Sequence, residues 1–165
     1  MPDPQACGDA ASRLAAALAA DGLSPHGAVL APSADGRGLE FRAAWGPAAA
    51  ELLQNLVRVP LQSIAGRALK RKQGVFINNA QTSREHFHIT DRLTGVGTRR
   101  LFALPIRIGR VGGRETLVLE LMQPRRDIEL SRVLDVVLQH GFRPVGWGPD
   151  SLSGTGTRSA SRYSA

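Results

Sequence analysis

The stretch INNAQTSREHFHITDRLTGVGTRRLFALPI, from Ile77 to Ile106, decides how the rest of the chain is interpreted. Both of its ends are apolar enough to be buried strands, whereas the residues between them, 78–100, are mostly polar or charged. A polar excursion of this length inside a compact domain is usually either functional or disordered. Because the excursion also contains apolar residues placed to pack, such as Phe87, we expect it to fold over the domain.

Length and composition predict a single domain. The chain has 165 residues, 42% of them hydrophobic and 5% aromatic, so the core is built mostly from Leu, Val, Ile and Ala. One cysteine, Cys7, excludes an internal disulfide and a four-thiolate zinc site. No secretory signal is visible, and the alanine-rich stretch 14–20 is too short to span a bilayer. We therefore expect a cytoplasmic protein without a membrane partner.

The chain is strongly basic, with a formal net charge of +7. Such a charge invites a nucleic-acid hypothesis, which would show as a steep salt dependence of binding. The arginines are scattered along the sequence, however, and the one tight basic run, 67–72, ends an expected helix, where cations interact favourably with the helix dipole. The sequence therefore does not favour a nucleic-acid partner.

Hydrophobic periodicity and capping residues predict a mixture of helices and short strands. Asp3 and Pro4 suit the start of a helix, and Gly22 suits the position after its end. We expect helices over residues 4–21, 48–57, 64–72 and 125–140. We expect strands over residues 26–31, 39–45, 74–78, 101–108 and 116–122, with a short extended piece at 58–61. Roughly five or six strands with helices segregated around them make an α+β domain.

A change of composition divides the chain after residue 142. We expect residues 1–142 to form the folded domain with its flanking helices. Residues 143–165 are rich in Gly, Ser, Thr and Pro and have little to bury. We therefore expect them to form a disordered C-terminal tail.

Several short motifs occur in an order that resembles GAF domains. They are a small-residue turn in a helix, a strand that ends in Ile-Asn, an excursion with Phe and Asp, a TGxxTR-like segment, and a strand that ends in Pro-Ile. In this chain they are Ile64-Ala65-Gly66, Ile77-Asn78, Phe87 with Asp91, Thr94-Gly95 with Thr98-Arg99, and Leu104-Pro105-Ile106. The closing strand follows at 116–123, and the match covers about residues 25–124.

The resemblance implies a GAF-like fold: a roughly six-stranded antiparallel sheet with helices on one face and a ligand pocket on the other. The excursion would form the wall or lid of that pocket. The flanking N- and C-terminal helices would pair two copies into a homodimer.

Some GAF domains that resemble cyclic-nucleotide sensors carry an Asn-Lys pair and a Phe-x-x-x-Asp-Glu signature. Phe87 and Asp91 fit this signature, but Arg92 replaces the Glu. The nearest approach to the Asn-Lys pair is Asn78-Asn79. A cyclic nucleotide is therefore an open but not favoured ligand.

The candidate ligand-binding residues all lie in the excursion: Asn78, Phe87, Asp91, Thr94, Thr98 and Arg99. Arg99 could hold a phosphate or carboxylate through bidentate hydrogen bonds, or it could pair with Asp91 and fix the loop, and we favour the pairing. Asp91 could accept hydrogen bonds from a ligand or cap the turn that follows it. Thr94 and Thr98 could line the mouth of a pocket or only make turns, and Phe87 is expected to pack inward.

No catalytic or metal-binding constellation is evident in the sequence. His86 and His88 lie beside Glu85, but no further ligand accompanies them, so we expect no metal site. Cys7 is in the first expected helix and cannot supply the cysteine chemistry of sulfoxide-reducing GAF relatives or the attachment site of bilin-carrying ones. No Gly-rich phosphate loop lies between a strand and a helix. We expect no enzyme, and the cofactor, if any, is unknown.

Two functional hypotheses follow. In the first, the chain is a sensory or regulatory module that binds a small molecule under the excursion. Binding orders the excursion and shifts the flanking helices, so that a second copy or a signalling partner responds. In the second, the chain is a GAF scaffold used only for protein–protein association, and its own side chains fill the pocket.

Overall fold

The computed structural model describes residues 4–47, 49–54, 58–82, 100–108, 116–122 and 130–146. The helices are α1 (Pro4–Asp21), α2 (Ala49–Gln54), α3 (Ile64–Arg71) and α5 (Leu130–Gln139), with a short 3₁₀ helix η1 (Ala80–Thr82). The strands are β1 (His26–Pro32), β2 (Gly38–Trp45), β3 (Arg58–Pro60), β4 (Val75–Ile77), β5 (Leu101–Ile108), β6 (Thr116–Met122) and β7 (Phe142–Pro144). Each predicted helix and strand is present among the described residues, whereas residues 48 and 55–57 of the second expected helix lie outside them. Residues 125–129 of the last expected helix lie outside the described residues.

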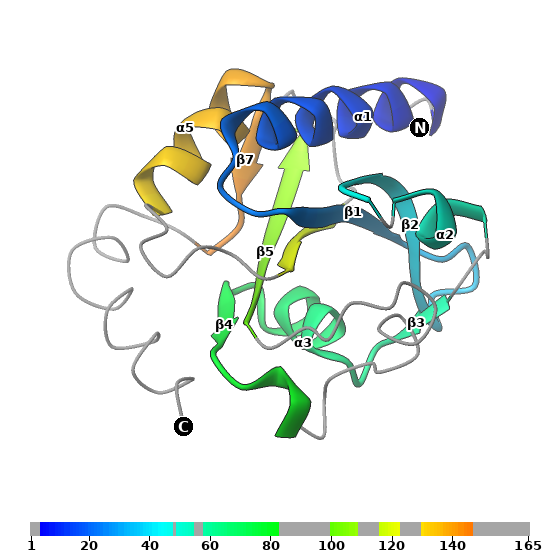
Figure 1. Ribbon diagram of the computed structural model, residues 1–165. Helices are drawn as coiled ribbons and strands as arrows, with labels where there is room; N and C mark the ends of the chain where they lie inside the picture. The colour runs from blue at the N-terminus through cyan, green and yellow to red at the C-terminus, as the bar shows by residue number, and fades with distance from the viewer. Residues whose placement is uncertain are drawn as a thin grey trace.

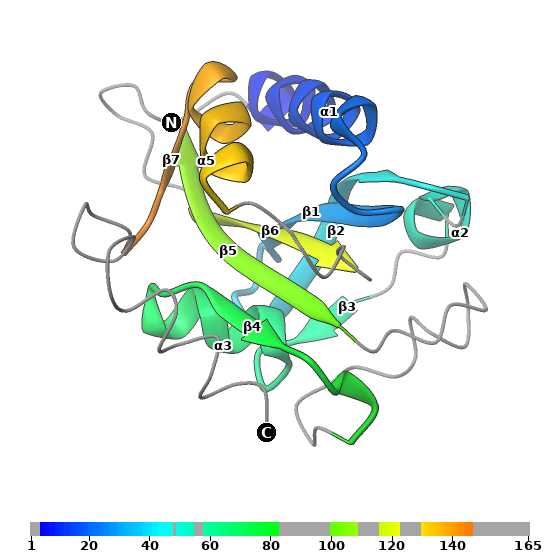
Figure 2. The ribbon, with the colours of Figure 1, turned by 60° about the vertical axis from the view of Figure 1, so that its left-hand side comes forward.

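The strands form one sheet in which every paired neighbour is antiparallel. Its order is β3-β2-β1-β6-β5-β4, and the seventh strand, β7, pairs with β5. Strand β6 occupies one edge of β5, so β4 and β7 share the other edge. As Figure 2 shows, β4 lies along one end of β5 and β7 along the other end. Both of these edge strands have three residues, which limits pairing with other chains.

The start of the expected tail at residue 143 is wrong. Arg143 and Pro144 belong to β7, where they pair with Arg107 and Ile106 of β5. The Val145 N–H then donates to the Pro105 carbonyl at 2.8 Å. The polar composition of this segment concealed a strand because β7 needs one buried apolar anchor, Phe142, and not an alternating pattern. Residues 147–165 lie outside the described residues.

Helices cover both faces of the sheet. Helices α1 and α5 lie together on one face and α3 lies on the other (Figure 1). The resemblance implied helices on one face and a ligand pocket on the other, and the structure adds α3 to that second face. The physical reason is visible in the central strands, where successive residues point to opposite faces and are apolar on both. In β1, Val29 and Ala31 join the cluster under α1, whereas Ala28 and Leu30 join the cluster under α3.

Helix α3 is capped at both ends by its own sequence. The Ser63 hydroxyl accepts a hydrogen bond from the Gly66 N–H at 3.1 Å, which satisfies one of the free donors of the first turn. At the other end Lys72 adopts the left-handed conformation with φ 52°. A Cβ at Gly66 would overlap the Leu61 carbonyl, so glycine is required where the preceding loop crosses the helix.

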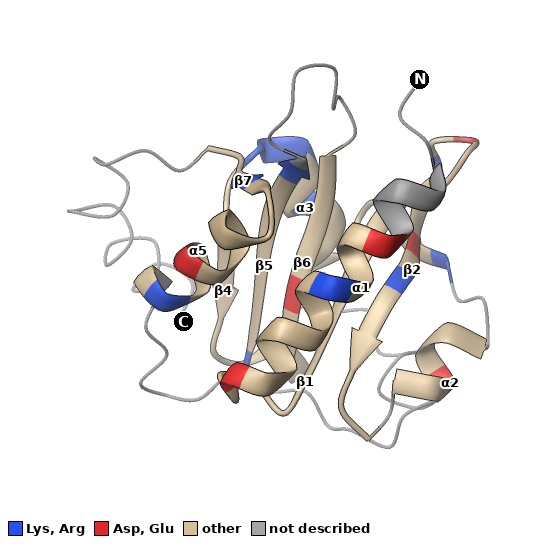
Figure 3. Cartoon of the chain, turned by 90° about the horizontal axis from the view of Figure 1, so that it is seen from above, with Lys and Arg blue, Asp and Glu red and all other residues tan. Residues whose placement is uncertain are grey.

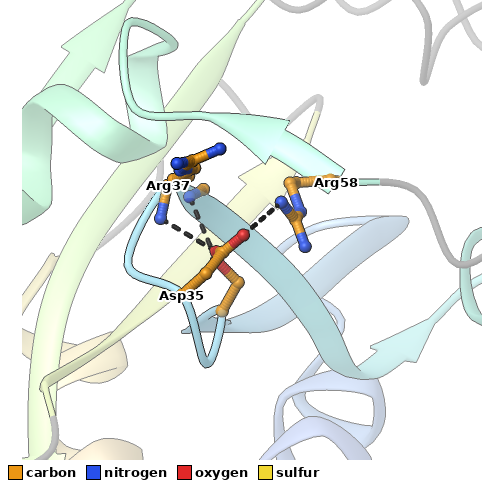
Figure 4. A network of polar contacts seen from close by, with 5 residues as sticks. Asp35, Arg37 and Arg58 are labelled. Atoms are coloured by element: carbon orange, nitrogen blue, oxygen red, sulfur yellow. Dashed lines mark hydrogen bonds and ion pairs between the residues drawn. The ribbon is translucent and has the colours of Figure 1, made fainter.

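The turn between β1 and β2 is held by a polar network around Asp35 (Figure 4). The Asp35 carboxylate accepts hydrogen bonds from the Ser33 hydroxyl at 2.7 Å and the Arg37 N–H at 3.1 Å. It also forms an ion pair with Arg58 of β3 at 2.8 Å. These contacts, led by the Ser33 hydrogen bond, lower the pKa of Asp35. Because Asp35 and Arg58 are both exposed, the network sets the local geometry of the hairpin more than the stability of the domain.

Trp45 closes the end of the β1–β2 hairpin over a glycine. Its indole N–H donates to the Ser24 carbonyl at 3.1 Å, and its ring covers Gly27 on the neighbouring strand. A Cβ at Gly27 would overlap that ring. The glycine is therefore a packing requirement, not a turn residue.

We predict that Gly27→Ala lowers the free energy of unfolding by about 1–3 kcal/mol, because the added methyl group overpacks the site. Urea denaturation measures this change. In the double variant Gly27→Ala with Trp45→Phe, the smaller ring makes room for the methyl group, so the loss should be smaller than the sum of the two single losses. Additive losses would show that Gly27 and Trp45 do not compete for the same space.

Helices α1 and α5 are joined by an ion pair at their ends. Arg132 donates from Nη2 to Asp21 Oδ1 at 2.8 Å and from Nε to both carboxylate oxygens at 3.2 Å. The hydrogen bond from Arg132 lowers the pKa of Asp21. Asp21 is the last residue of α1, where a negative charge is unfavourable beside the helix dipole. Arg132 therefore offsets an otherwise unfavourable charge.

We predict that Arg132→Ala destabilises the domain more than Asp21→Asn, with both losses below about 1 kcal/mol because Arg132 is largely exposed. The first variant leaves a carboxylate at the negative end of a helix, whereas the second removes it. The contribution of the pair should be present above the unfolded Asp pKa of about 3.9 and lost as pH falls through the lower folded pKa. Unfolding curves at neutral and acidic pH measure both effects, and equal losses would contradict the account.

Candidate functional site

The two ends of the excursion are neighbours in the sheet. Ile77, the last residue of β4, pairs directly with Leu101, the first residue of β5. The excursion thus leaves and returns at the same place on the sheet edge. Of the predicted site residues, Asn78 is exposed directly after β4. The other five, Phe87, Asp91, Thr94, Thr98 and Arg99, lie outside the described residues, so their grouping stays a prediction.

One carboxylate is buried within the sheet itself. Glu120 lies in the middle of β6 and is 9% exposed, and it is the one buried Asp or Glu among the described residues. Its neighbours Leu119 and Leu121 belong to the cluster under α1 and α5. Because side chains alternate along a strand, Glu120 points to the opposite face, the α3 face.

Glu120 is surrounded by small side chains. Its cross-strand partners are Ala28 on β1 and Ala103 on β5. The same row continues outward to Ala44 on β2 and Val75 on β4. The row therefore contains three alanines and one valine around a single carboxylate, and all five positions face α3.

The rows on either side of this one are made of larger residues. On one side lie Met122, Leu101 and Ile77, and on the other lie Leu30 and Val118. The alanine row is thus the place on the α3 face where the side chains are shortest. Short side chains allow either a helix or another group to approach the strand backbone closely.

Helices cover the two ends of the alanine row. Helix α3 packs against β4, β5 and β6, whereas α2 packs against β2 and β1. Ala65 and Ala68 of α3 and Leu52 of α2 belong to the cluster on this face. Glu120 lies on β6, which α3 contacts, and Ala28 lies on the neighbouring strand β1, which α2 contacts.

A carboxylate in this position constrains what can lie beside it. Removing a charge from water is costly unless the charge is paired or hydrogen-bonded. Glu120 takes part in a polar or electrostatic interaction, so its position is held by the protein. An ionised carboxylate at this position favours cations and N–H or O–H donors nearby and disfavours anions.

The sequence contained a signal for this residue. Glu120 interrupts an otherwise apolar strand, Thr116–Met122, whose sequence is TLVLELM. Such a strand has no solvent-facing side where a charge would be inexpensive. An interpretation of this segment only as the closing strand of the sheet gives the charge no role.

The histidine pair and the single cysteine of the sequence are not among the described residues of this face. Among the described residues, no group of three or more His, Cys, Asp or Glu side chains could hold a metal ion. His86 and His88 lie outside these residues. Cys7 is in α1, on the face of the sheet opposite Glu120. None of the helices in the described part of the chain has the length and apolarity that crossing a bilayer requires.

Comparison with known proteins identifies the fold. No protein-family model matches the chain, and no curated protein matches it. Among solved structures, the GAF domain of a phosphoenolpyruvate-protein phosphotransferase from Coxiella burnetii aligns with a TM-score of 0.61 and 12% identity over 85% of this chain and 82% of that one. The A. aeolicus nlh2 GAF domain aligns with a TM-score of 0.57 and 18% identity, over 81% of this chain and 79% of that chain.

A free methionine-R-sulfoxide reductase from Neisseria meningitidis is similar as well, with a TM-score of 0.56 and 14% identity over 79% of this chain and 74% of that one. The fold is thus shared by GAF domains and by these reductases. Identities this low show a common fold and nothing of a common activity. With an antiparallel sheet between α1 and α5 on one face and α3 on the other, the chain has a GAF-like fold.

Proposed function

We propose that this protein is a cytoplasmic sensory or regulatory module that binds a small molecule on the α3 face of its sheet, and that it is not an enzyme. GAF domains are typically sensory or regulatory modules. The observation that carries the proposal is the buried Glu120 carboxylate in a row of alanines. Glu120 already has an interaction within the protein, and we propose that the ligand becomes an additional partner of the same carboxylate.

The charge of Glu120 selects the class of ligand. A buried carboxylate favours a protonated amine or a group with several N–H donors. A cyclic nucleotide carries a negative charge and is therefore disfavoured beside it. The excursion begins after Ile77 and ends before Leu101, and both of these residues face α3. We propose that side chains of the excursion complete the ligand site: Asn78, Phe87, Asp91, Thr94, Thr98 and Arg99.

Strand β6 offers a path from the ligand to the helices. Glu120 faces the ligand side, whereas Leu119 and Leu121 pack in the cluster with Leu14, Leu18 and Val137 of α1 and α5. A ligand that moves or stiffens β6 acts on both faces at once, because alternate residues of one strand are rigidly linked. We propose that α1 and α5 transmit the signal to a second copy or a regulatory partner.

The surface of α5 supports pairing of two copies. Leu138 of α5 is 55% exposed, and α5 contacts α1 on the same face of the sheet. Leu138 is the one exposed large apolar side chain that the described residues of α1 and α5 present, so a second copy packed on these helices would bury it. We propose that α1 and α5 form the interface of a homodimer.

We predict that protonated amines, screened as free amino acids, their amides and polyamines, raise the melting temperature, and that Glu120→Gln abolishes the rise. A ligand at about 100 times its Kd stabilises the native state by about 2.7 kcal/mol. Thermal-shift titration measures the effect, and the loss of charge should weaken binding at least about tenfold, as a charge-assisted hydrogen bond is removed.

The matched control is Glu40→Gln, which removes one carboxylate from the half-buried position of β2. It should keep the ligand response of the wild-type protein. If Glu120→Gln and Glu40→Gln respond alike to the same amine, Glu120 does not recognise the ligand. If no amine shifts the wild-type protein, the proposed ligand class is wrong.

We predict that Leu138→Glu converts the dimer to a monomer in size-exclusion chromatography with light scattering. The control is Leu53→Glu on α2, which changes the other exposed large apolar side chain of the described residues. That variant should remain dimeric. A wild-type monomer, or equal loss of dimer in both variants, would contradict the proposed interface. A stable dimer that no small molecule shifts would favour a scaffold used only for association.

A further inference from the structure

The fold gathers basic residues that are far apart in the sequence. Strand β7 places Arg143 directly opposite Arg107 of β5. Ile106 and Phe142 pack toward α1 and α5, so both arginines point to the α3 face. Figure 3 shows Lys and Arg concentrated where β7, β5 and α3 meet.

The end of α3 adjoins the same corner. The chain after β7 runs against the helix end, where a Cβ at Gly146 would overlap the Lys72 carbonyl. Lys70, Arg71 and Lys72 are all exposed at that helix end. Together with Arg107 and Arg143 they form what we call the basic corner.

Placing Arg107 opposite Arg143 lowers the stability of the folded domain. Like charges directly opposite each other in an antiparallel pair are destabilising. Arg107 donates from Nη2 to the Thr116 hydroxyl at a long 3.4 Å, and its buried Nε has no hydrogen-bond partner. Segments 58–82, 100–108 and 136–146, which include α3, β5 and β7, contain no Asp or Glu. The helix dipole accounts for the three cations on α3 but not for the arginines on the strands.

The character of the corner favours one class of partner. Protein interfaces depend on a few aromatic or aliphatic anchors at their centre. The exposed large apolar side chains of the described residues are Leu53 on α2 and Leu138 on α5, and neither belongs to the corner. A phosphate backbone, in contrast, requires only cations in reach of successive phosphates.

We propose that the basic corner is a binding surface for the phosphate backbone of a nucleic acid, without sequence preference. Arg107 and Arg143 share one phosphate, which removes their mutual repulsion, and the cations of α3 contact the following phosphates. Because no residue of the corner offers an exposed aromatic ring, bases are not read by stacking. The surface is separate from the proposed ligand site and does not depend on it.

Fluorescence anisotropy with a labelled duplex of about 20 base pairs, at salt concentrations from about 50 to 200 mM, tests the proposal. The triple variant Lys70→Gln, Arg71→Gln and Arg143→Gln should bind at least about tenfold more weakly at about 100 mM salt. The slope of log K against log salt should become shallower by about 0.9 for each phosphate that the variant no longer neutralises.

The matched control removes three charges elsewhere, with Arg13→Gln, Arg37→Gln and Arg42→Gln, which are exposed on α1, the β1–β2 turn and β2. It has the same net charge as the corner variant and should lose less than about threefold in affinity. The charge-retaining variant Lys70→Arg with Arg143→Lys should bind like the wild-type protein, which separates lost charge from lost folding.

Equal losses in the corner and control variants would overturn the proposal, because net charge alone would then explain binding. Poly-glutamate that displaces the duplex as well as unlabelled duplex does would also overturn it, and would point to an acidic protein instead. Absence of binding by the wild-type protein at the lowest salt concentration would have the same consequence.

Discussion

Burial of the sheet on both faces is the constraint on which the rest of the structure depends. Helices cover each side, so most positions of the central strands carry buried apolar side chains. Each fully buried aliphatic side chain contributes about 1.5–3 kcal/mol, and the two clusters together contain most of the core. In the middle of β6, between Leu119 and Leu121, a charge has no side of the strand on which it can reach water freely. Burying the Glu120 carboxylate in such a strand therefore costs free energy that an interaction must offset.

The same constraint links the two halves of the proposed mechanism. A strand buried on both faces cannot shift on one side without displacing the side chains on the other. Leu119 and Leu121 are adjacent to Glu120 in the chain and face α1 and α5. A ligand on the α3 face and a partner on the helices would then be coupled through β6. The coupling requires that β6 has two positions and that the ligand binds one of them more tightly than the other.

The order of the elements could be predicted because its signals are local. Asp3, Pro4 and Gly22 mark the ends of the first helix, and alternation or apolar runs mark the strands. Strand β7 could not be predicted in this way, because three residues that include Arg and Pro show no periodicity. Its existence depends on a free edge of β5, which is a property of the folded sheet.

The sites depend on longer-range relations than the elements do. Glu120 could have been found from its place in an apolar strand, but its alanine neighbours come from strands that begin at residues 26 and 101. The basic corner joins residues 72, 107 and 143, which appeared scattered in the sequence and so counted against a nucleic-acid partner. Only the pairing of β5 with β7 and the contact between Gly146 and Lys72 bring them together.

The central claim is that a small molecule with a protonated amine binds beside Glu120. The most direct measurement is a two-dimensional ¹H–¹⁵N NMR titration of the labelled protein with the amine that stabilises it best. The account predicts saturable shifts at the amides of Ala28, Ala103 and Glu120, with smaller shifts reaching α1 and α5. Shifts confined to surface residues away from the α3 face, with the alanine row unchanged at saturation, would contradict it.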